Sequence, residues 1–231
     1  MDEAHNARTN LSFDTLQRFS PSCILEFTAT PDQETNPSNV LYSVSAAELK
    51  AEQMVKLPIR IVSRTQWKEA VGEAVARQRQ LEQIAKEEEK RTGEYLRPIV
   101  LFQAQPRREG QETITVEALR KCLLEDFKIS AEEIAEGTGH KWELPENLLS
   151  RECPVRYILT VAALREGWDC PFAYVLCSVS NLSSKGAVEQ ILGRVLRLPN
   201  ANAKEHAELN IAYAFATSAQ FLEAARSLAA C

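Results

Sequence analysis

Residues 155–198, VRYILTVAALREGWDCPFAYVLCSVSNLSSKGAVEQILGRVLRL, decide the fold class of this protein. They open with an apolar run at 155–161, pass through a polar turn, and reach a second apolar run at 173–179. Apolar residues at helical spacing follow at 184–198. Mostly apolar runs of this length predict strands buried in a parallel sheet, and the pattern after them predicts a helix.

The same alternation continues on both sides of this stretch. The sequence predicts further strands at 99–102 and 209–215, helices at 116–127 and 218–230, and a long charged helix at 67–91 whose end at 86–91 is expected to be solvated. Strands alternating with helices predict an α/β fold, a parallel sheet with helices on both faces. Ligands of such folds bind beyond the carboxyl ends of the strands, so the chemistry is expected there.

Upstream of residue 65, the predicted elements are too few for a complete α/β domain. Short strands are predicted at 23–27 and 40–44, with a polar loop between them and a helix at 45–54. The pattern changes near 58–65, which is the expected domain boundary. The length of 231 residues suits one large domain plus part of another.

Bulk composition indicates an ordinary globular protein and excludes several classes. Apolar residues make up 45% of the chain and charged residues 26%, and the net charge of -5 gives no support for a globally basic nucleic-acid binder. No apolar run reaches the roughly eighteen residues of a membrane span, and the acidic N-terminus is unlike a secretory signal. The six cysteines include no C-x-x-C pair, so reduced thiols in a cytoplasmic protein are expected.

The predicted helix at 184–198 carries the most informative polar pattern. Its residues Gln190, Gly193, Arg194 and Arg197 follow the spacing Q-x-x-G-R-x-x-R, which at about 100° per residue places all four on one helix face. The opposite face is apolar. Two arginines aimed at one place suit a γ-phosphate, and Gly193 leaves room for a close approach. A solvated amphipathic face is the alternative, but it would explain only the charges and not these residue identities.

Two other segments suggest nucleotide chemistry. The tetrapeptide Asp2-Glu3-Ala4-His5 offers adjacent carboxylates that suit an Mg²⁺–nucleotide site, one to bind the metal and one to orient or deprotonate water. The turn at 160–171, TVAALREGWDCP, carries Gly167 and Asp169 and is interpreted as a contact loop for a phosphate backbone or a bound nucleotide. Trp168 is interpreted as a core anchor.

Taken in this order, the segments resemble the motifs of superfamily 2 DEAD/DEAH-type helicases. DEAH at 2–5 resembles motif II, and Thr28-Ala29-Thr30 resembles motif III. The strand end at 99–103 stands where motif IV would be, LREGWDCP at 164–171 resembles motif V, and QILGRVLR at 190–197 resembles motif VI. The wording of the last two is most similar to the Res (restriction) subunits of type III restriction enzymes and related bacterial helicases. The resemblance covers nearly the whole chain.

The resemblance implies two RecA-like domains with ATP in the cleft between them and nucleic acid across their tops, with DNA favoured over RNA. By position it also implies residue roles. Asp2 would hold Mg²⁺ through water, Glu3 would activate the attacking water, and His5 would couple to Gln190. Thr28 and Thr30 would link hydrolysis to domain movement, and Gly167 and Asp169 would sense the nucleotide and the nucleic-acid backbone. Arg194 and Arg197 would reach the γ-phosphate, with Arg197 as the arginine finger.

The chain departs from the family pattern at its start. It begins at DEAH itself, and the sequence holds no G-x-x-x-x-G-K-[ST] phosphate-binding loop. Residues 137–142, GTGHKW, lack that spacing and are predicted to form a turn. We therefore expect residues 1–64 to be the C-terminal remnant of a first RecA-like domain, with the DEAH and TAT motifs, and residues 65–231 to be a second RecA-like domain, the helicase C-terminal domain.

The sequence thus predicts a fragment of an ATP-dependent DNA helicase or translocase of the type III restriction kind. Its implied cofactors are ATP and Mg²⁺. Its implied partners are nucleic acid, the missing N-terminal RecA-like half and, for a restriction subunit, a methyltransferase (Mod) subunit; no membrane is implied. Without a phosphate-binding loop, the isolated chain is expected to hydrolyse ATP poorly. The alternative is a non-catalytic nucleic-acid- or protein-binding module whose motif residues are relics.

Overall fold

The computed structural model describes residues 10–28, 39–107, 110, 113–161, 168–180, 185–218, 221–223 and 225. The chain forms two compact units, Met1–Val44 and Ser45–Cys231. The second unit therefore begins upstream of the boundary expected near residue 65. It takes in the helix α2 (Ala46–Ala51) and the strand β1 (Ile59–Ser63).

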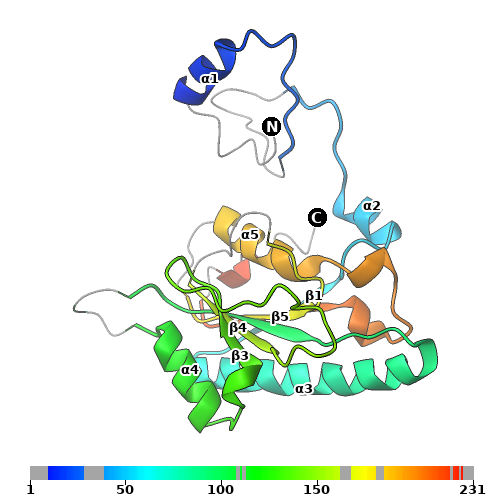
Figure 1. The fold of residues 1–231 in the computed structure, drawn as a ribbon, viewed down its shortest axis with the longest axis vertical. Helices are drawn as coiled ribbons and strands as arrows, with labels where there is room; N and C mark the ends of the chain where they lie inside the picture. The colour runs from blue at the N-terminus through cyan, green and yellow to red at the C-terminus, as the bar shows by residue number, and fades with distance from the viewer. Residues whose placement is uncertain are drawn as a thin grey trace. The chain divides into compact units, whose positions relative to one another are not determined.

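A six-stranded, wholly parallel sheet is the centre of the second unit (Figure 1). Its strands lie in the order β1-β6-β5-β2-β4-β3. Besides β1, they are β2 (Ile99–Gln103), β3 (Ile134–Glu136), β4 (Tyr157–Thr160), β5 (Ala173–Ser178) and β6 (Ala212–Ala216). The predicted parallel sheet is confirmed.

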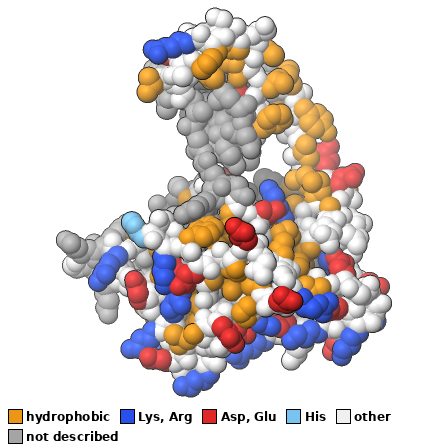
Figure 2. Space-filling model, in the orientation of Figure 1, with side chains coloured by type: hydrophobic (Ala, Val, Ile, Leu, Met, Phe, Trp, Pro, Cys, Tyr) orange, Lys and Arg blue, Asp and Glu red, His pale blue; other side chains and the backbone are white. Residues whose placement is uncertain are grey.

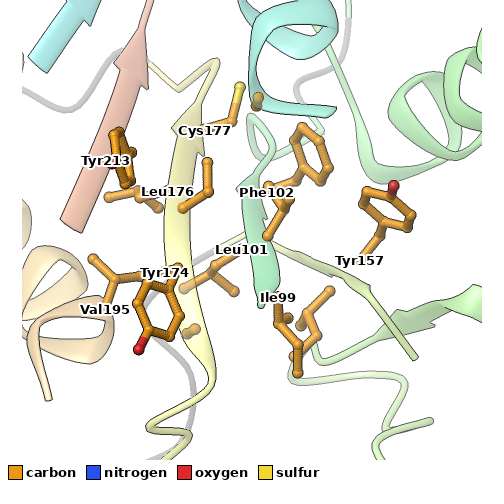
Figure 3. Close-up of a cluster of buried hydrophobic side chains, with 14 of the residues drawn as sticks. Ile99, Leu101, Phe102, Tyr157, Tyr174, Leu176, Cys177, Val195 and Tyr213 are labelled. Atoms are coloured by element: carbon orange, nitrogen blue, oxygen red, sulfur yellow. The ribbon is translucent and has the colours of Figure 1, made fainter. Parts of the chain in front are cut away.

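Helices cover both faces of this sheet, as predicted. On one face lie α3 (Trp67–Thr92) and α4 (Val116–Glu125), and on the other lies α5 (Lys185–Leu196) (Figure 1). Because both faces are covered, every residue of β2, β4, β5 and β6 is buried. Figure 3 shows side chains from these strands gathered in one apolar core, including Phe102, Leu176 and Tyr213.

Local sequence explains where the helices begin and end. Gly93 closes α3 with φ at 76°, a left-handed conformation that glycine adopts without strain. Thr115 caps the start of α4 by accepting a hydrogen bond from the backbone N–H of Ala118. Ser45 and Glu48 form a reciprocal capping box at α2. Short 3₁₀ turns occur at Ala131–Glu133, Pro199–Ala201 and Ala207–Asn210.

The charged end of α3 is not simply solvated, contrary to the prediction for 86–91. Glu88 is 5% exposed, and its carboxylate accepts hydrogen bonds from the backbone N–H groups of Glu205 and His206, each at 2.9 Å. Arg91 forms an ion pair with Glu205 at 3.0 Å. The charges at this end of the helix therefore hold the loop that precedes β6.

The first unit lacks the two strands that the sequence predicts. Its one helix among the described residues is α1 (Asn10–Gln17), and no strand is assigned at residues 23–28 or 39–44. Leu41 and Tyr42 are each 80% exposed, and Figure 2 shows apolar side chains on the surface of this unit. An apolar run becomes a strand only when a neighbouring strand pairs with it, so these two predictions are wrong.

Two negative findings concern the described residues. None of their helices is long and apolar enough to cross a membrane. Cys122, Cys153, Cys170 and Cys177 are free and buried and Cys23 is free and exposed, which agrees with reduced thiols, most of them in the core.

Candidate functional site

Helix α5 has the two faces that its sequence predicts. Val188, Ile191, Leu192 and Val195 are completely buried, and the helix packs against β5 and β6. On the other side, Gln190 and Gly193 are exposed and Arg194 is half-buried. A Cβ atom placed on Gly193 would meet nothing within 4 Å, so the chain itself does not require glycine there.

Arg197 lies just beyond the helix rather than on it. The helix ends at Leu196, and Arg197 forms an antiparallel bridge with Val55. The backbone N–H of Lys56 donates to the carbonyl of Leu196 at 2.6 Å, and the N–H of Leu198 donates to the carbonyl of Met54 at 2.9 Å. Pairing with this upstream segment therefore fixes the backbone of Arg197. Its side chain is 62% exposed.

Both arginines reach the same loop. Arg197 Nη1 lies 2.7 Å from Asp169 Oδ2, and Arg194 Nη1 donates to the backbone carbonyl of Trp168. Trp168 itself is half-buried against the core, as predicted. The structure thus brings together Asp169, Arg194 and Arg197, which the sequence placed in two separate motifs.

The Asp169–Arg197 pair is exposed, and exposed ion pairs are typically worth about 1 kcal/mol or less. A guanidinium can bind a phosphate through two parallel hydrogen bonds, just as it can bind a carboxylate. The Arg197 side chain can therefore exchange Asp169 for a phosphate at little cost. This chemistry fits a γ-phosphate.

The position of the pair differs from the expected one. The sequence placed the chemistry beyond the carboxyl ends of the strands, but Asp169 lies just before Ala173, the first residue of β5. A helix that follows a parallel strand runs back along the sheet, so the end of α5 returns to the amino end of β5. The crossover thus explains why Arg197 meets the loop that enters β5.

Lys56 is a buried cation at this site that the sequence analysis did not single out. Its Nζ atom donates to the carbonyls of Pro171, at 2.8 Å, and Ala173, at 2.7 Å, and lies 3.9 Å from the centre of the Tyr174 ring. Burial lowers the pKa of Lys56 to about 7. The surrounding sequence MVKLP does not indicate that this lysine is buried, because lysine side chains are ordinarily exposed to solvent.

Several predicted site residues lie outside the described part of the chain. These are Asp2, Glu3, His5, Thr30 and Gly167. Thr28 is half-buried in the first unit, whereas Gln190 stands on the exposed face of α5. Among the described residues, no group of three or more histidine, cysteine or acidic side chains could hold a metal ion. The Mg²⁺ site, and the coupling of His5 to Gln190, stay predictions from the resemblance.

The rejected phosphate-loop candidate is a turn. The backbone N–H of Thr138 donates to the carbonyl of Lys141 at 2.8 Å, and Gly137 forms an antiparallel bridge with Trp142. A surface hollow of about 380 Å³ beside β3 and one of about 400 Å³ beside α3 share no lining residue with the Asp169–Arg197 pair. These hollows add nothing to the candidate site.

Comparison with known proteins supports the helicase resemblance. No family model matches the chain. Two curated relatives are 43% identical over 54 residues, namely the Res subunits of the type III restriction-modification enzymes EcoPI, from Escherichia phage P1, and EcoP15I, from Escherichia coli. That match covers 23% of this chain but only 6% of either relative.

Solved structures extend the comparison to most of the chain. A fragment described as the HsdR subunit of a type I restriction enzyme from Vibrio vulnificus YJ016 has a TM-score of 0.55 and 19% identity, covering 89% of this chain and 41% of that one. Domain 2 of the DEAD-box helicase Mss116p has a TM-score of 0.40 at 15% identity, covering 74% of this chain and 59% of its own. The likeness to the HsdR fragment shows that the two chains share a fold, and together with the short match to the Res subunits it agrees with the expected resemblance.

Proposed function

We propose that this chain is part of an ATP-dependent DNA helicase or translocase of the type III restriction kind, in which Arg197 stabilises the transferring γ-phosphate. The observation that carries the proposal is the convergence of Arg194 and Arg197 on the loop at Asp169. Those arginines and that loop hold the positions that motifs VI and V hold in the resemblance. The six-stranded parallel sheet that supports them is what the helicase resemblance predicts.

The reaction requires charge stabilisation more than covalent chemistry. In phosphoryl transfer, an arginine placed at the γ-phosphate stabilises the charge that spreads over the equatorial oxygens. Arg197 has the exposure and the fixed backbone for this role, and Arg194 supports it from the preceding helical turn. Asp169 pairs with the Arg197 guanidinium at 2.7 Å and so orients it.

The remaining parts of the motor are proposed from the resemblance. Residues 1–64 would be the end of a first RecA-like domain, in which Asp2 would bind Mg²⁺ and Glu3 would activate water. An upstream half with a phosphate-binding loop would hold the β- and γ-phosphates. The motor would move along DNA, and in a restriction enzyme it would bind a Mod subunit.

ATP turnover by two forms of the protein tests the proposal. The 231-residue chain alone should hydrolyse ATP no faster than buffer, because the phosphates have no cradle. The same chain joined to the upstream half that carries the phosphate-binding loop should hydrolyse ATP, and duplex DNA should stimulate the rate at least about tenfold, equivalent to 1.4 kcal/mol of barrier.

Other outcomes would overturn the proposal. Rapid turnover by the purified 231-residue chain would mean that its phosphate site is complete without the upstream half. A joined protein that binds DNA but never hydrolyses ATP would favour the non-catalytic module, in which the motif residues are relics.

A further inference from the structure

Lys56 occupies an unusual environment for a lysine. It is 0% exposed, and in the described part of the chain its ammonium contacts no carboxylate. Instead it has two backbone carbonyls as acceptors and the Tyr174 ring at 3.9 Å. The direct contacts of the ammonium are all neutral, with Asp169 acting on it from further away, and burying a charge in this way is costly. A cation kept in such a place therefore has to contribute something that an apolar side chain would not.

Lys56 connects the two loops of the candidate site. Its backbone N–H is bonded to Leu196, the last residue of α5, and its side chain is bonded to Pro171 and Ala173, at the start of β5. Arg197 directly follows Leu196, and Asp169 lies two residues before Pro171. Lys56 therefore touches both segments whose separation decides whether these two side chains meet.

Lys56 also lies in the segment that opens the second unit. This unit begins at Ser45, and residues 45–58 lead from there to β1. The stretch from Met54 to Lys56 pairs with the residues at the end of α5 and just after it. The segment is therefore bonded to the Arg197 region through its backbone and to the Asp169 loop through the lysine side chain.

We propose that Lys56 is a positioning residue that fixes the Asp169 loop against the end of α5 and so sets the Arg197 guanidinium for phosphate. The inference rests on the function proposed above. The charges and titratable groups that act on the Lys56 ammonium are Asp169, Cys170 and Lys204, and burial lowers its pKa to about 7. The bonding to the carbonyls is geometric and does not depend on that pKa.

The substitution Lys56→Met tests the proposal because methionine is unbranched and of similar length, so it removes the donor with little change of shape. Lys204→Met is the matched control. Lys204 is also buried, at 6% exposed, but its ammonium binds Glu94 at 2.6 Å and the Pro199 carbonyl instead of the carbonyls of Pro171 and Ala173. Lys56→Gln, which keeps a donor on a shorter side chain, replaces Lys56→Met if the latter fails to fold.

The first readout is the side-chain Nε–Hε resonance of Arg197 in the 231-residue chain, which needs no enzymatic activity. Asp169→Asn supplies the reference for a broken pair. We expect Lys56→Met to move the resonance most of the way to that reference, and Lys204→Met to leave it in place. An unchanged resonance in folded Lys56→Met, or an equal change in both lysine variants, would refute the positioning role.

The second readout is ATP turnover by the chain joined to its upstream half. Lys56→Met should lower kcat about tenfold, or 1.4 kcal/mol, and change KM less than twofold, because the defect lies in aligning Arg197 and not in binding ATP. If Lys56→Met displaces the Arg197 resonance but keeps a wild-type kcat, then positioning of Arg197 by Lys56 does not affect ATP hydrolysis. If the unmutated joined protein hydrolyses no ATP, the proposed function fails, and the resonance alone decides whether Lys56 positions Arg197.

Discussion

Arg197 shows what a single residue gains from its surroundings. Its identity and spacing were visible in the sequence, but its partner and its placement were not. The helix ends one residue earlier than the predicted face requires, and a bridge to Val55 fixes the residue instead. That bridge joins segments far apart in the chain, and local periodicity cannot report such a contact.

Lys56 is the residue for which sequence reasoning had least to offer, and it allows a test by pH. Its pKa is lowered to about 7 from an ordinary value of 10.5, so at pH 7 to 10 the unfolded chain binds more protons at this site than the folded chain. Folding stability from this group is therefore lowest below pH 7 and rises with pH up to about 10.

We expect folded Lys56→Met to have a larger free energy of unfolding than the wild type at pH 6.5. This difference should shrink by roughly 1–2 kcal/mol by pH 8.5. Denaturant unfolding of both proteins at each pH measures this gap, and taking the difference cancels the other titrating groups. A gap that stays constant or widens with pH would show that the Lys56 ammonium keeps its proton throughout this range.

At the scale of elements, long periodic patterns were predictable and short edge strands were not. The helices α3, α4 and α5 and the central strands β2, β4 and β5 were all predicted, because burial leaves a continuous apolar signal. Strand β3 has only three residues and pairs with β4 alone, and β1 lies at the other edge of the sheet. Neither edge strand has enough buried positions to stand out in the sequence.

Helix α5 allows stability and function to be separated. Gly193 and Gly186 are both exposed, and a Cβ atom on either would meet nothing within 4 Å. Because glycine destabilises a helix relative to alanine, Gly193→Ala should raise the free energy of unfolding by about 0.5–1 kcal/mol, and Gly186→Ala by the same amount or less.

Only Gly193→Ala should slow ATP turnover in the joined protein, by about tenfold or more, if Gly193 provides the close approach for phosphate. Thermal unfolding and steady-state kinetics on the same samples give both quantities. Equal turnover by the two alanine variants would show that the glycine is not needed for phosphate to approach.

At the scale of the whole molecule, the second unit has a complete sheet with both faces covered, and the first unit exposes much of its apolar surface. The sequence predicted residues 1–64 to be the remnant of a larger domain, and the exposed apolar side chains of Leu41 and Tyr42 agree with that proposal. On the function proposed above, activity is expected only when an upstream half with a phosphate-binding loop is supplied.

Single-turnover ATP hydrolysis by the joined protein shows whether Arg197 acts on the transferring phosphate. Arg197→Ala should lower the rate at least about 100-fold while nucleotide affinity changes less than about threefold, because the guanidinium contributes in the transition state. Arg151→Ala is the control, since Arg151 is 65% exposed, against 62% for Arg197, and pairs with Glu89 on α3. A wild-type rate in Arg197→Ala, or loss of nucleotide binding in the folded variant, would contradict the account.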